Sequence, residues 1–466
     1  MHQALHIFRK DLRYLSVETA SLVLLTLMFP GFRSRYFFSV DLTLAYEFLI
    51  VMASGYLIAC LIQAESIPGT NQFWITRPYL WRSLLAAKLA YILLFVNVPI
   101  LIVQIAILAT EKFPIASNWQ GLLATQMLFL IALELPLTAL AALTRGLVGF
   151  VSSVLTLALL VMGGSALNQI PVSFAWIRSS MILMGALLIA IPVLILQYRG
   201  RRTVRNRYLS LAAACLTVAA LVLTPWSSLF AVQSRISKVP VDVKLDLDPD
   251  WKLELFSEPG RELELTLPVR LSELPPGMRL QFEEFSVTLR NAAGRELRMS
   301  EGRLTEELLS GSHFGIRGHA PMDAAFFADA PNQPLTLRAS FYLTILGNSH
   351  SIAMTAPDVP APISDGMQCA ATSSDDMVFR AAFRLPARYI EVLNPPATTV
   401  SDSQRAPVDH PVSYSPFPAG LRINPIAVSQ PYFLIPGHPV AHIVISEPLA
   451  YVRRDLEVSG LHLIAR

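Results

Sequence analysis

The sequence has few cysteines and lacks the best-known nucleotide, zinc and serine-nucleophile motifs. Its three cysteines are Cys60, Cys215 and Cys369, and two of them lie in apolar runs, so no disulfide framework is predicted. There is no G-x-x-x-x-G-K-[ST] loop, so we expect no ATP hydrolysis on this chain. H-E-x-x-H and G-x-S-x-G are also missing, which removes the simplest zinc-peptidase and serine-hydrolase sites, and we predict no metal site.

Charge is scarce as well. Charged residues make up 15% of the chain, against about a quarter in soluble proteins, whereas 53% of residues are hydrophobic and the mean hydropathy is +0.48. The apolar excess lies almost entirely before Phe230, and the remainder has an ordinary soluble composition. The formal net charge of +3 is too small to indicate a nucleic-acid partner. The composition therefore predicts a membrane domain followed by a soluble domain.

Seven apolar runs are expected to cross the bilayer, which requires about twenty residues, and the first of them is short and is expected to include Leu15 and flanking residues. They cover 17–29, 42–63, 85–109, 122–143, 147–166, 181–196 and 209–230. The first run has no small-residue cleavage site, so we expect no cleavable signal peptide. Residues 1–14 before it have the pattern of an amphipathic interfacial helix, with Arg9, Lys10, Asp11 and Arg13 expected on the wet side.

The cations predict how the chain crosses the membrane. If seven spans alternate, most cations fall on one side: Arg9, Lys10, Arg13, Arg77, Arg82, Lys88, Arg145 and the cluster 199–207. By the positive-inside rule we expect an integral protein of the inner (cytoplasmic) membrane, with a cytoplasmic N-terminus. The expected domains are the interfacial helix 1–14, a transmembrane domain 15–200, a seventh span within 201–231 and an extracytoplasmic domain 232–466.

The soluble half alternates apolar and polar residues with the period of a β-strand. Alternating segments occur at 239–247, 253–255, 263–267 and 285–289, separated by turn signals such as Pro275-Pro276-Gly277 and the stretch 291–294. Further strands are expected at 335–346, 379–385, 441–444 and 456–463. Short strands with proline-rich turns predict a mainly-β domain, a β-sandwich of one or two modules.

The segment from Glu65 to Lys88 is a sizeable polar interruption between two long apolar runs. It contains Glu65, the Pro68-Gly69 turn, the core Phe73-Trp74-Ile75-Thr76-Arg77-Pro78, and the run Leu84-Leu85-Ala86-Ala87-Lys88. These residues resemble the cytoplasmic loop of ABC-2 type transporter permeases, in which an acid and a glycine precede an FW-[LI]-[TS]-R-P core and a basic, Leu-rich run. The basic start of the chain is similar to that family's interfacial helix. An interfacial loop with an aromatic belt is the alternative interpretation.

The resemblance implies a permease subunit of an ATP-driven exporter, with a six-span core to which a seventh span has been added. It implies that the loop 64–88 couples the chain to a separate ATPase dimer, which binds ATP and Mg²⁺. The partners would be that ATPase, a second permease copy or paralogue, and membrane lipid. No catalytic residue or cofactor is expected on this chain. The implied ATPase-coupling surface consists of Glu65, Gly69, Phe73, Trp74, Arg77 and Pro78.

Ionisable residues inside membrane spans are costly, and two are predicted here, Glu47 and Glu134. With the neutral Asn97 and Gln104 of another span, they are candidates for a translocation path or a dimer seam. Alternatively, Glu47 sits at the outer interface, and Glu134 satisfies a kinked backbone or pairs with a cation. A second function class also remains open, a membrane-anchored binding or sensor protein that acts through its extracytoplasmic β-domain.

Overall fold

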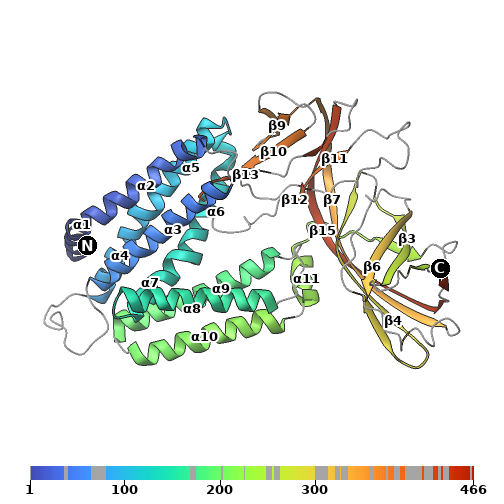
Figure 1. Ribbon diagram of the computed structural model, residues 1–466, viewed down its shortest axis with the longest axis horizontal. Helices are drawn as coiled ribbons and strands as arrows, with labels where there is room; N and C mark the ends of the chain where they lie inside the picture. The colour runs from blue at the N-terminus through green and yellow to red at the C-terminus, as the bar shows by residue number, and fades with distance from the viewer. Residues whose placement is uncertain are drawn as a thin grey trace.

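The structure is a computed structural model in which helices fill the first half of the chain and strands the second (Figure 1). The two halves also lie apart in space, and they meet where the ends of α5 and α6 approach β9, β10 and β13 and where α11 contacts β15. The residues outside the description are 1, 36–39, 65–79, 168–174, 201–202, 225, 248–253, 257–262, 276, 300–312, 321–325, 327–333, 356–359, 365, 374–375, 383–388, 394–411, 414–422, 429–431, 434–439, 462–463 and 466.

Helices occupy nearly every described residue up to Ser234. Their bounds are α1 His2–Tyr14, α2 Ser16–Arg35, α3 Val40–Gln63, α4 Trp81–Ile92, η2 Leu93–Asn97, α5 Val98–Thr110, α6 Ile115–Phe129, η3 Leu130–Glu134, α7 Leu135–Leu143, α8 Leu147–Leu167, α9 Ala175–Gly200, α10 Thr203–Leu223 and α11 Trp226–Ser234. The predicted interfacial helix is α1, which meets α2 at an angle of 78°. The apolar run predicted as a seventh span is divided between α10 and α11, which flank Pro225.

Several helices are long and apolar enough to cross a membrane. Among the described residues there are four: Leu42–Gln63, Trp81–Thr110, Ile115–Leu143 and Ser180–Arg199. The number is five if α1 and α2 together form one bent span. By the length and composition of these helices the chain is a membrane protein. The count of seven spans is not confirmed and stays a prediction.

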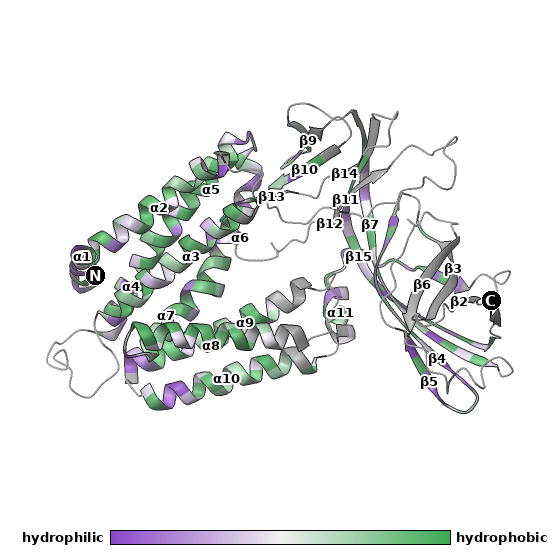
Figure 2. Cartoon of the chain, viewed as in Figure 1, coloured by the Kyte–Doolittle hydropathy of each residue, from purple (hydrophilic) through white to green (hydrophobic). Residues whose placement is uncertain are grey.

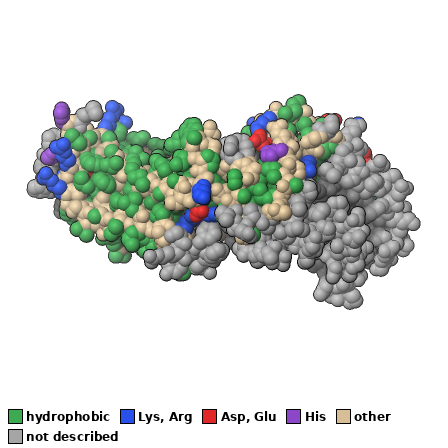
Figure 3. All heavy atoms as spheres, turned by 90° about the horizontal axis from the view of Figure 1, so that it is seen from above, with side chains coloured by type: hydrophobic (Ala, Val, Ile, Leu, Met, Phe, Trp, Pro, Cys, Tyr) green, Lys and Arg blue, Asp and Glu red, His purple; other side chains and the backbone are tan. Residues whose placement is uncertain are grey.

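The outside of the helical half is apolar, as Figures 2 and 3 show. Large exposed side chains include Leu24 of α2, Phe48 of α3, Leu159 of α8 and Leu188 of α9. A continuous apolar surface of this kind is unfavourable in water and is typical of a protein surface that contacts lipid. The apolar surface of the bundle and the lengths of its helices therefore both indicate a membrane protein.

Two spans contain a π-helical turn directly before a proline. η2 ends at Asn97, two residues before Pro99, and η3 ends at Glu134, two residues before Pro136. Proline has no backbone N–H to donate, and its ring clashes with the carbonyl four residues earlier. The wider turn accommodates that carbonyl, so each span continues as one helix.

The second half of the chain forms three sheets. The strands are β1 Lys244–Leu247, β2 Glu254–Phe256, β3 Leu263–Glu273, β4 Arg279–Arg290, β5 Glu296–Met299, β6 His313–Ala320, β7 Leu335–Thr355, β8 Ala361–Ser364, β9 Met367–Ser373, β10 Asp376–Ala382, β11 Tyr389–Leu393, β12 Val412–Ser413, β13 Ile426–Val428, β14 Tyr432–Phe433, β15 Val440–Leu461 and β16 Ile464–Ala465. We call β1-β3-β2-β16 with β6 the distal sheet, β12-β11-β15-β7-β4-β5 the central sheet, and β13-β10-β9-β8 with β14 the junction sheet. The described strand pairs are antiparallel except β2 with β16, which confirms the predicted mainly-β half.

Two long strands, β7 and β15, run through the whole β region (Figure 1). They are 21 and 22 residues long and pair with each other along almost their full length. The sequence analysis divided β15 into two short strands, which is wrong. Pro448 lies at a register shift in the pairing, and a bulge is where a strand tolerates a residue that cannot donate a ladder hydrogen bond.

The apolar cores show how the parts are joined. The core of the helices includes Ala382 and Ile426 of the junction sheet and Ile423 just before it. The junction sheet is therefore packed on the helix bundle. A second core joins the distal sheet, through Val269, with β4 and β7 of the central sheet.

Candidate functional site

The predicted ATPase-coupling surface lies outside the described residues. Glu65, Gly69, Phe73, Trp74, Arg77 and Pro78 all fall within 65–79. The structure does describe the two helices that border this segment, the end of α3 at Gln63 and the start of α4 at Trp81. What can be examined is therefore how these two helices are held.

A buried ion pair holds α4 against α1, and a hydrogen bond from the same lysine holds it against α3. The Lys88 ammonium lies 2.8 Å from a carboxylate oxygen of Asp11, and both side chains are 1% exposed. Lys88 Nζ also donates a 3.0 Å hydrogen bond to the carbonyl of Leu61 in the last turn of α3. The expectation that Asp11 lies on the wet side of the interfacial helix is wrong, because this side chain turns inward to meet Lys88.

Further contacts show that the same end of the bundle gathers several helix ends. Gln63 donates a 3.0 Å hydrogen bond to the hydroxyl of Thr144, which follows α7. Arg207 of α10 donates a 2.8 Å hydrogen bond to the carbonyl of Leu143. Exposed cations at this end include Arg9, Arg82, Arg145, Arg205 and Arg207. We call it the basic end of the bundle, and Figure 3 shows Lys and Arg side chains gathered at the left end of the molecule.

In the middle of the bundle the structure brings two predicted residues together. Asn97 Nδ2 lies 2.7 and 2.6 Å from the two carboxylate oxygens of Glu134, and both residues are buried. Each ends a π-helical turn, so the two irregular turns face each other. The described partner of the Glu134 carboxylate is an amide, whereas a cation was one of the alternatives considered from the sequence.

Glu47 lies elsewhere, at the opposite end of the bundle. It is 5% exposed, and its carboxylate accepts a 3.1 Å hydrogen bond from the backbone N–H of Asn424, just before β13. The structure therefore joins Asn97 with Glu134 and separates Glu47 from them. Glu47 is a contact between α3 and the β region.

A second charged group at this end, where the bundle meets the β region, was missed by the sequence analysis. The carboxylate of Glu111, directly after α5, lies 2.8 Å from Arg33 of α2 and 2.6 Å from Arg380 of β10. Gln368 of β9 donates a 2.8 Å hydrogen bond to the carbonyl of Glu111. Arg33 and Arg380 are both buried. We call Arg33, Glu111 and Arg380 the junction triad, since it ties two helices to the junction sheet.

The junction triad predicts a defined response to acid. Burial alone would raise the pKa of Glu111, but the hydrogen bond from Arg380 and the charges of Arg380 and Arg33 outweigh it and hold the pKa below its ordinary value of 4.5. A lowered folded-state pKa contributes stability above the ordinary value, and the contribution is lost as the pH falls through the folded-state pKa. We expect hydrogen exchange in β9 and β10 to be insensitive to pH near neutrality, after correction for intrinsic exchange rates, and to rise below about pH 4.5.

The matched variant for this prediction is Glu111→Gln, which keeps the size of the side chain and removes its titration. Its corrected exchange in β9 and β10 should be higher than in the wild type near neutrality and should lack the acid-dependent step. An equal acid response in both proteins would assign the effect to other carboxyl groups.

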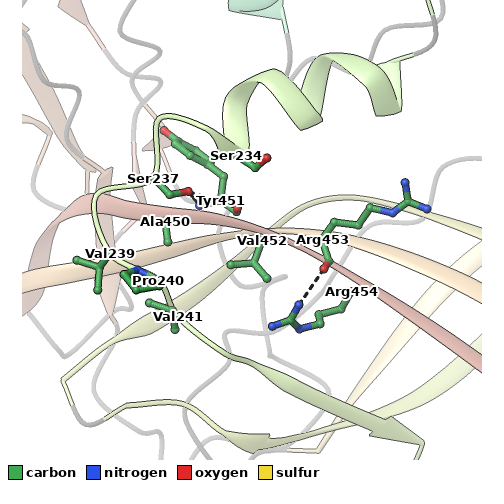
Figure 4. Close-up of a pocket in the computed structure, with 10 residues that line it drawn as sticks. All are labelled: Ser234, Ser237, Val239, Pro240, Val241, Ala450, Tyr451, Val452, Arg453 and Arg454. Carbon is green, nitrogen blue, oxygen red and sulfur yellow. Dashed lines mark hydrogen bonds between the residues drawn. The ribbon is translucent and has the colours of Figure 1, made fainter.

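One hollow on the described surface lies where α11 meets β15 (Figure 4). It has a volume of about 460 Å³ and is lined by Ser234, Ser237, Val239, Pro240, Val241, Ala450, Tyr451, Val452, Arg453 and Arg454. Backbone contacts close one side: Lys238 N–H donates to the carbonyl of Leu449 at 2.8 Å, and Tyr451 N–H donates to the Ser237 hydroxyl at 3.0 Å. The hollow is thus mainly the place where the end of the helical half is fastened to the long strand.

The described residues contain no group of three His, Cys, Asp or Glu side chains placed to hold a metal ion. Comparison of the chain with protein-family models, with curated proteins and with solved structures finds no match. The features that bear on function are therefore the polar contacts at the two ends and in the middle of the helix bundle.

Proposed function

We propose that this chain is the membrane subunit of an ABC-2 type ATP-driven exporter, coupled through its loop 64–88 to a separate ATPase dimer that binds ATP and Mg²⁺. The observation that carries the proposal is the buried contact of Lys88 with Asp11 and with the carbonyl of Leu61. It braces the two helices that border the loop against each other and against the interfacial helix. A second copy of the chain, or a paralogue, completes the transport unit.

The proposed topology has seven crossings, six in the permease core and one in α10, with the basic end in the cytoplasm. The gathering of exposed cations at the basic end supports this orientation through the positive-inside rule. The β region then lies outside the membrane, where the junction sheet covers the outer ends of the helices. Its distal and central sheets form a β-sandwich in this proposal, which is supported by the apolar core that they share.

We call the contact of Lys88 with Asp11 and with the carbonyl of Leu61 the basic-end brace. It would allow a movement of the loop to reach the helices. If an ATPase moved a loop whose ends were not held, the loop would change its shape and the helices would stay in place. Here the loop is followed within one α4 helix by Lys88, whose ammonium is bound on two sides by α1 and α3. A displacement of the loop would therefore move three helices together, and the catalytic step itself would take place on the partner chain.

Affinity purification of the full chain from its native membrane tests this proposal. We expect an ATPase of the ABC type to co-purify, and Phe73→Ala or Arg77→Ala to weaken its binding about thirtyfold, which corresponds to a loss of about 2 kcal/mol at an interface hot spot. Arg145→Ala is the control, since it removes an exposed cation at the same end but outside the loop.

Two results would overturn the proposal. One is labelling of a cysteine introduced at Trp74 by a membrane-impermeant reagent added outside the cell. The other is an isolated chain with no ATPase, which would favour the membrane-anchored binding or sensor protein. Loss of binding in Arg145→Ala equal to that in Arg77→Ala would indicate attraction by charge alone and would reject the loop as the docking surface.

A further inference from the structure

Polar side chains face one another at regular intervals along the hairpin formed by the spans Trp81–Thr110 and Ile115–Leu143. On the first span Asn97 and Gln104 are seven residues apart, which is close to two full turns. On the second span the polar residues are eight apart, and the wider π-helical turn of η3 brings Gln126 and Glu134 onto one face. Asn97 contacts Glu134, and Gln126 donates a 2.8 Å hydrogen bond to Gln104. Asn118 lies one further step toward the outer end. We call Asn97, Gln104, Asn118, Gln126 and Glu134 the polar seam.

The polar seam begins at the junction sheet and ends deep in the bundle. At its outer end Asn118 lies against the backbone of Gly366, so closely that a Cβ at Gly366 would come within 2.9 Å of the Asn118 Oδ1. From Glu111 to Asn97 the helix rises about 1.5 Å per residue, or about 20 Å in all, against a hydrocarbon thickness of about 30 Å. Glu134 therefore lies on the far side of the middle of the membrane when seen from outside.

The seam has more hydrogen-bonding capacity than its own pairs use. Asn97, Gln104 and Asn118 are 7%, 0% and 1% exposed, yet Asn97 Oδ1, Gln104 Nε2, Asn118 Oδ1 and Gln126 Oε1 have no hydrogen-bond partner among the described residues. Rotating the amides of Gln104 and Gln126 does not remove the excess, because their contact uses one group of each. An unpartnered buried polar group lowers stability by about 1–3 kcal/mol. Hydrogen bonding between the two helices therefore does not by itself account for the seam.

Asn97 is suited to hold Glu134 in both protonation states. Its N–H groups donate to the carboxylate when Glu134 is ionised. When a carboxylate oxygen takes up a proton, the new O–H can donate to the amide Oδ1 of Asn97 after the amide turns, and the negative charge disappears. A Lys or Arg partner would favour the ionised state alone. A metal cation would have to displace the N–H donors from the oxygens, so a proton fits this site better.

The surroundings of Glu134 contain little competing charge. The elements packed against η3 are α6, α7, η2 and α9. α6, α7 and η2 contain no Asp, Glu, His, Lys, Arg, Cys or Tyr, and α9 carries Arg178, Tyr198 and Arg199 near its two ends. The next ionisable residues of the hairpin toward the outside are Lys112 and Glu111. A proton arriving from outside would therefore meet neutral amides before it reached Glu134.

We propose that Glu134 is a proton-binding site inside the membrane, and that the polar seam is its path to water at the outer end of the bundle. The step is a simple protonation: one O–H bond breaks in a hydronium ion and one forms on Glu134, and water molecules hydrogen-bonded to the amides of the seam carry the proton from outside. The direction of the path rests on the orientation in the proposed function. The proton site itself does not depend on the ATPase partner, so it can fail or succeed separately from ATPase binding.

Infrared difference spectroscopy of the full chain in liposomes tests the proton site. Among the protonated-carboxyl signals that appear on acidification, we expect one that is missing in Glu134→Gln, while Glu47→Gln, which alters another buried carboxyl, keeps it. Asn97→Asp is a second variant, in which two carboxyl groups in contact should titrate in two steps in place of one. If the signals of the wild type and Glu134→Gln are identical, or Asn97→Asp adds no step, the proton site is wrong.

Cysteine labelling tests the path. In a background with Cys60, Cys215 and Cys369 replaced, Gln126→Cys should react with a hydrophilic thiol reagent added from outside at least about tenfold faster than Leu123→Cys. Leu123 is a suitable control because it is on the same helix and is exposed on the apolar surface. Equal rates at the two positions would overturn the seam as a route for water, whatever the infrared result.

Discussion

Lys88→Met is expected to destabilise the helix bundle by about 3–5 kcal/mol, because it removes the ammonium that faces a carboxylate buried between helices. The methionine fills nearly the same space, so little of the loss would come from packing. The two side chains are each 1% exposed, and water cannot replace the lost partner without opening the contact between α1 and α4. Thermal unfolding of the purified chain in detergent would measure the effect.

Two further variants distinguish the loss of a lysine charge in general from the loss of the buried partner of Asp11. Lys10→Met is the matched control: it makes the same change at an exposed lysine next to Asp11 and should alter stability by less than about 1 kcal/mol. The double variant Asp11→Val with Lys88→Met should recover most of the loss, since an apolar pair can replace a buried ion pair at little cost. If Lys88→Met unfolds at the same temperature as Lys10→Met, the pair is not the brace that the proposed coupling requires.

Much of the helical half could be predicted from the sequence, because long apolar runs have few alternatives to a buried or lipid-facing helix. Asn97 and Glu134 were also identified, each as a polar residue within a span. Their contact was not predicted, although a signal existed. Both polar pairs of the seam are centred on nearly the same position, close to Ile115 at the start of α6, as pairs of facing residues in an antiparallel helix hairpin must be.

Other parts of the structure left no such signal. Asp11 has the appearance of a solvated residue in an amphipathic helix, and its burial depends on Lys88, 77 residues later. The junction triad joins residues from α2, the end of α5 and β10. No local sequence pattern indicates which cations contact Glu111. The single long strand β15 was hidden by Pro448, since proline usually ends a strand and only the pairing with β7 shows the bulge.

The junction triad and the basic-end brace lie at opposite ends of the same helices. α4 leads from Lys88 through η2 and α5 to Glu111, and α3 leads from Leu61 back to Glu47. Both Glu111 and Glu47 contact the β region, Glu111 through Arg380 and Glu47 through the backbone of Asn424. A movement of α3 and of the span from α4 to α5 at the basic end would therefore displace the contacts of the junction sheet. The stability of the junction triad therefore determines how firmly the junction sheet follows these helices.

Glu111→Ala is expected to loosen the junction sheet from the helices at a cost of about 3–5 kcal/mol, because two buried guanidinium groups lose the carboxylate that lies between them. Hydrogen exchange should rise in β8, β9 and β10, while the distal sheet, which shares a separate apolar core with the central sheet, keeps its protection. Glu457→Ala is the matched control: its ion pair with Arg338 is more than half exposed on both sides and should contribute less than about 1 kcal/mol. Equal exchange in the junction sheet of both variants would mean that apolar packing alone fastens the β region, and that helix movements need not reach it through charge.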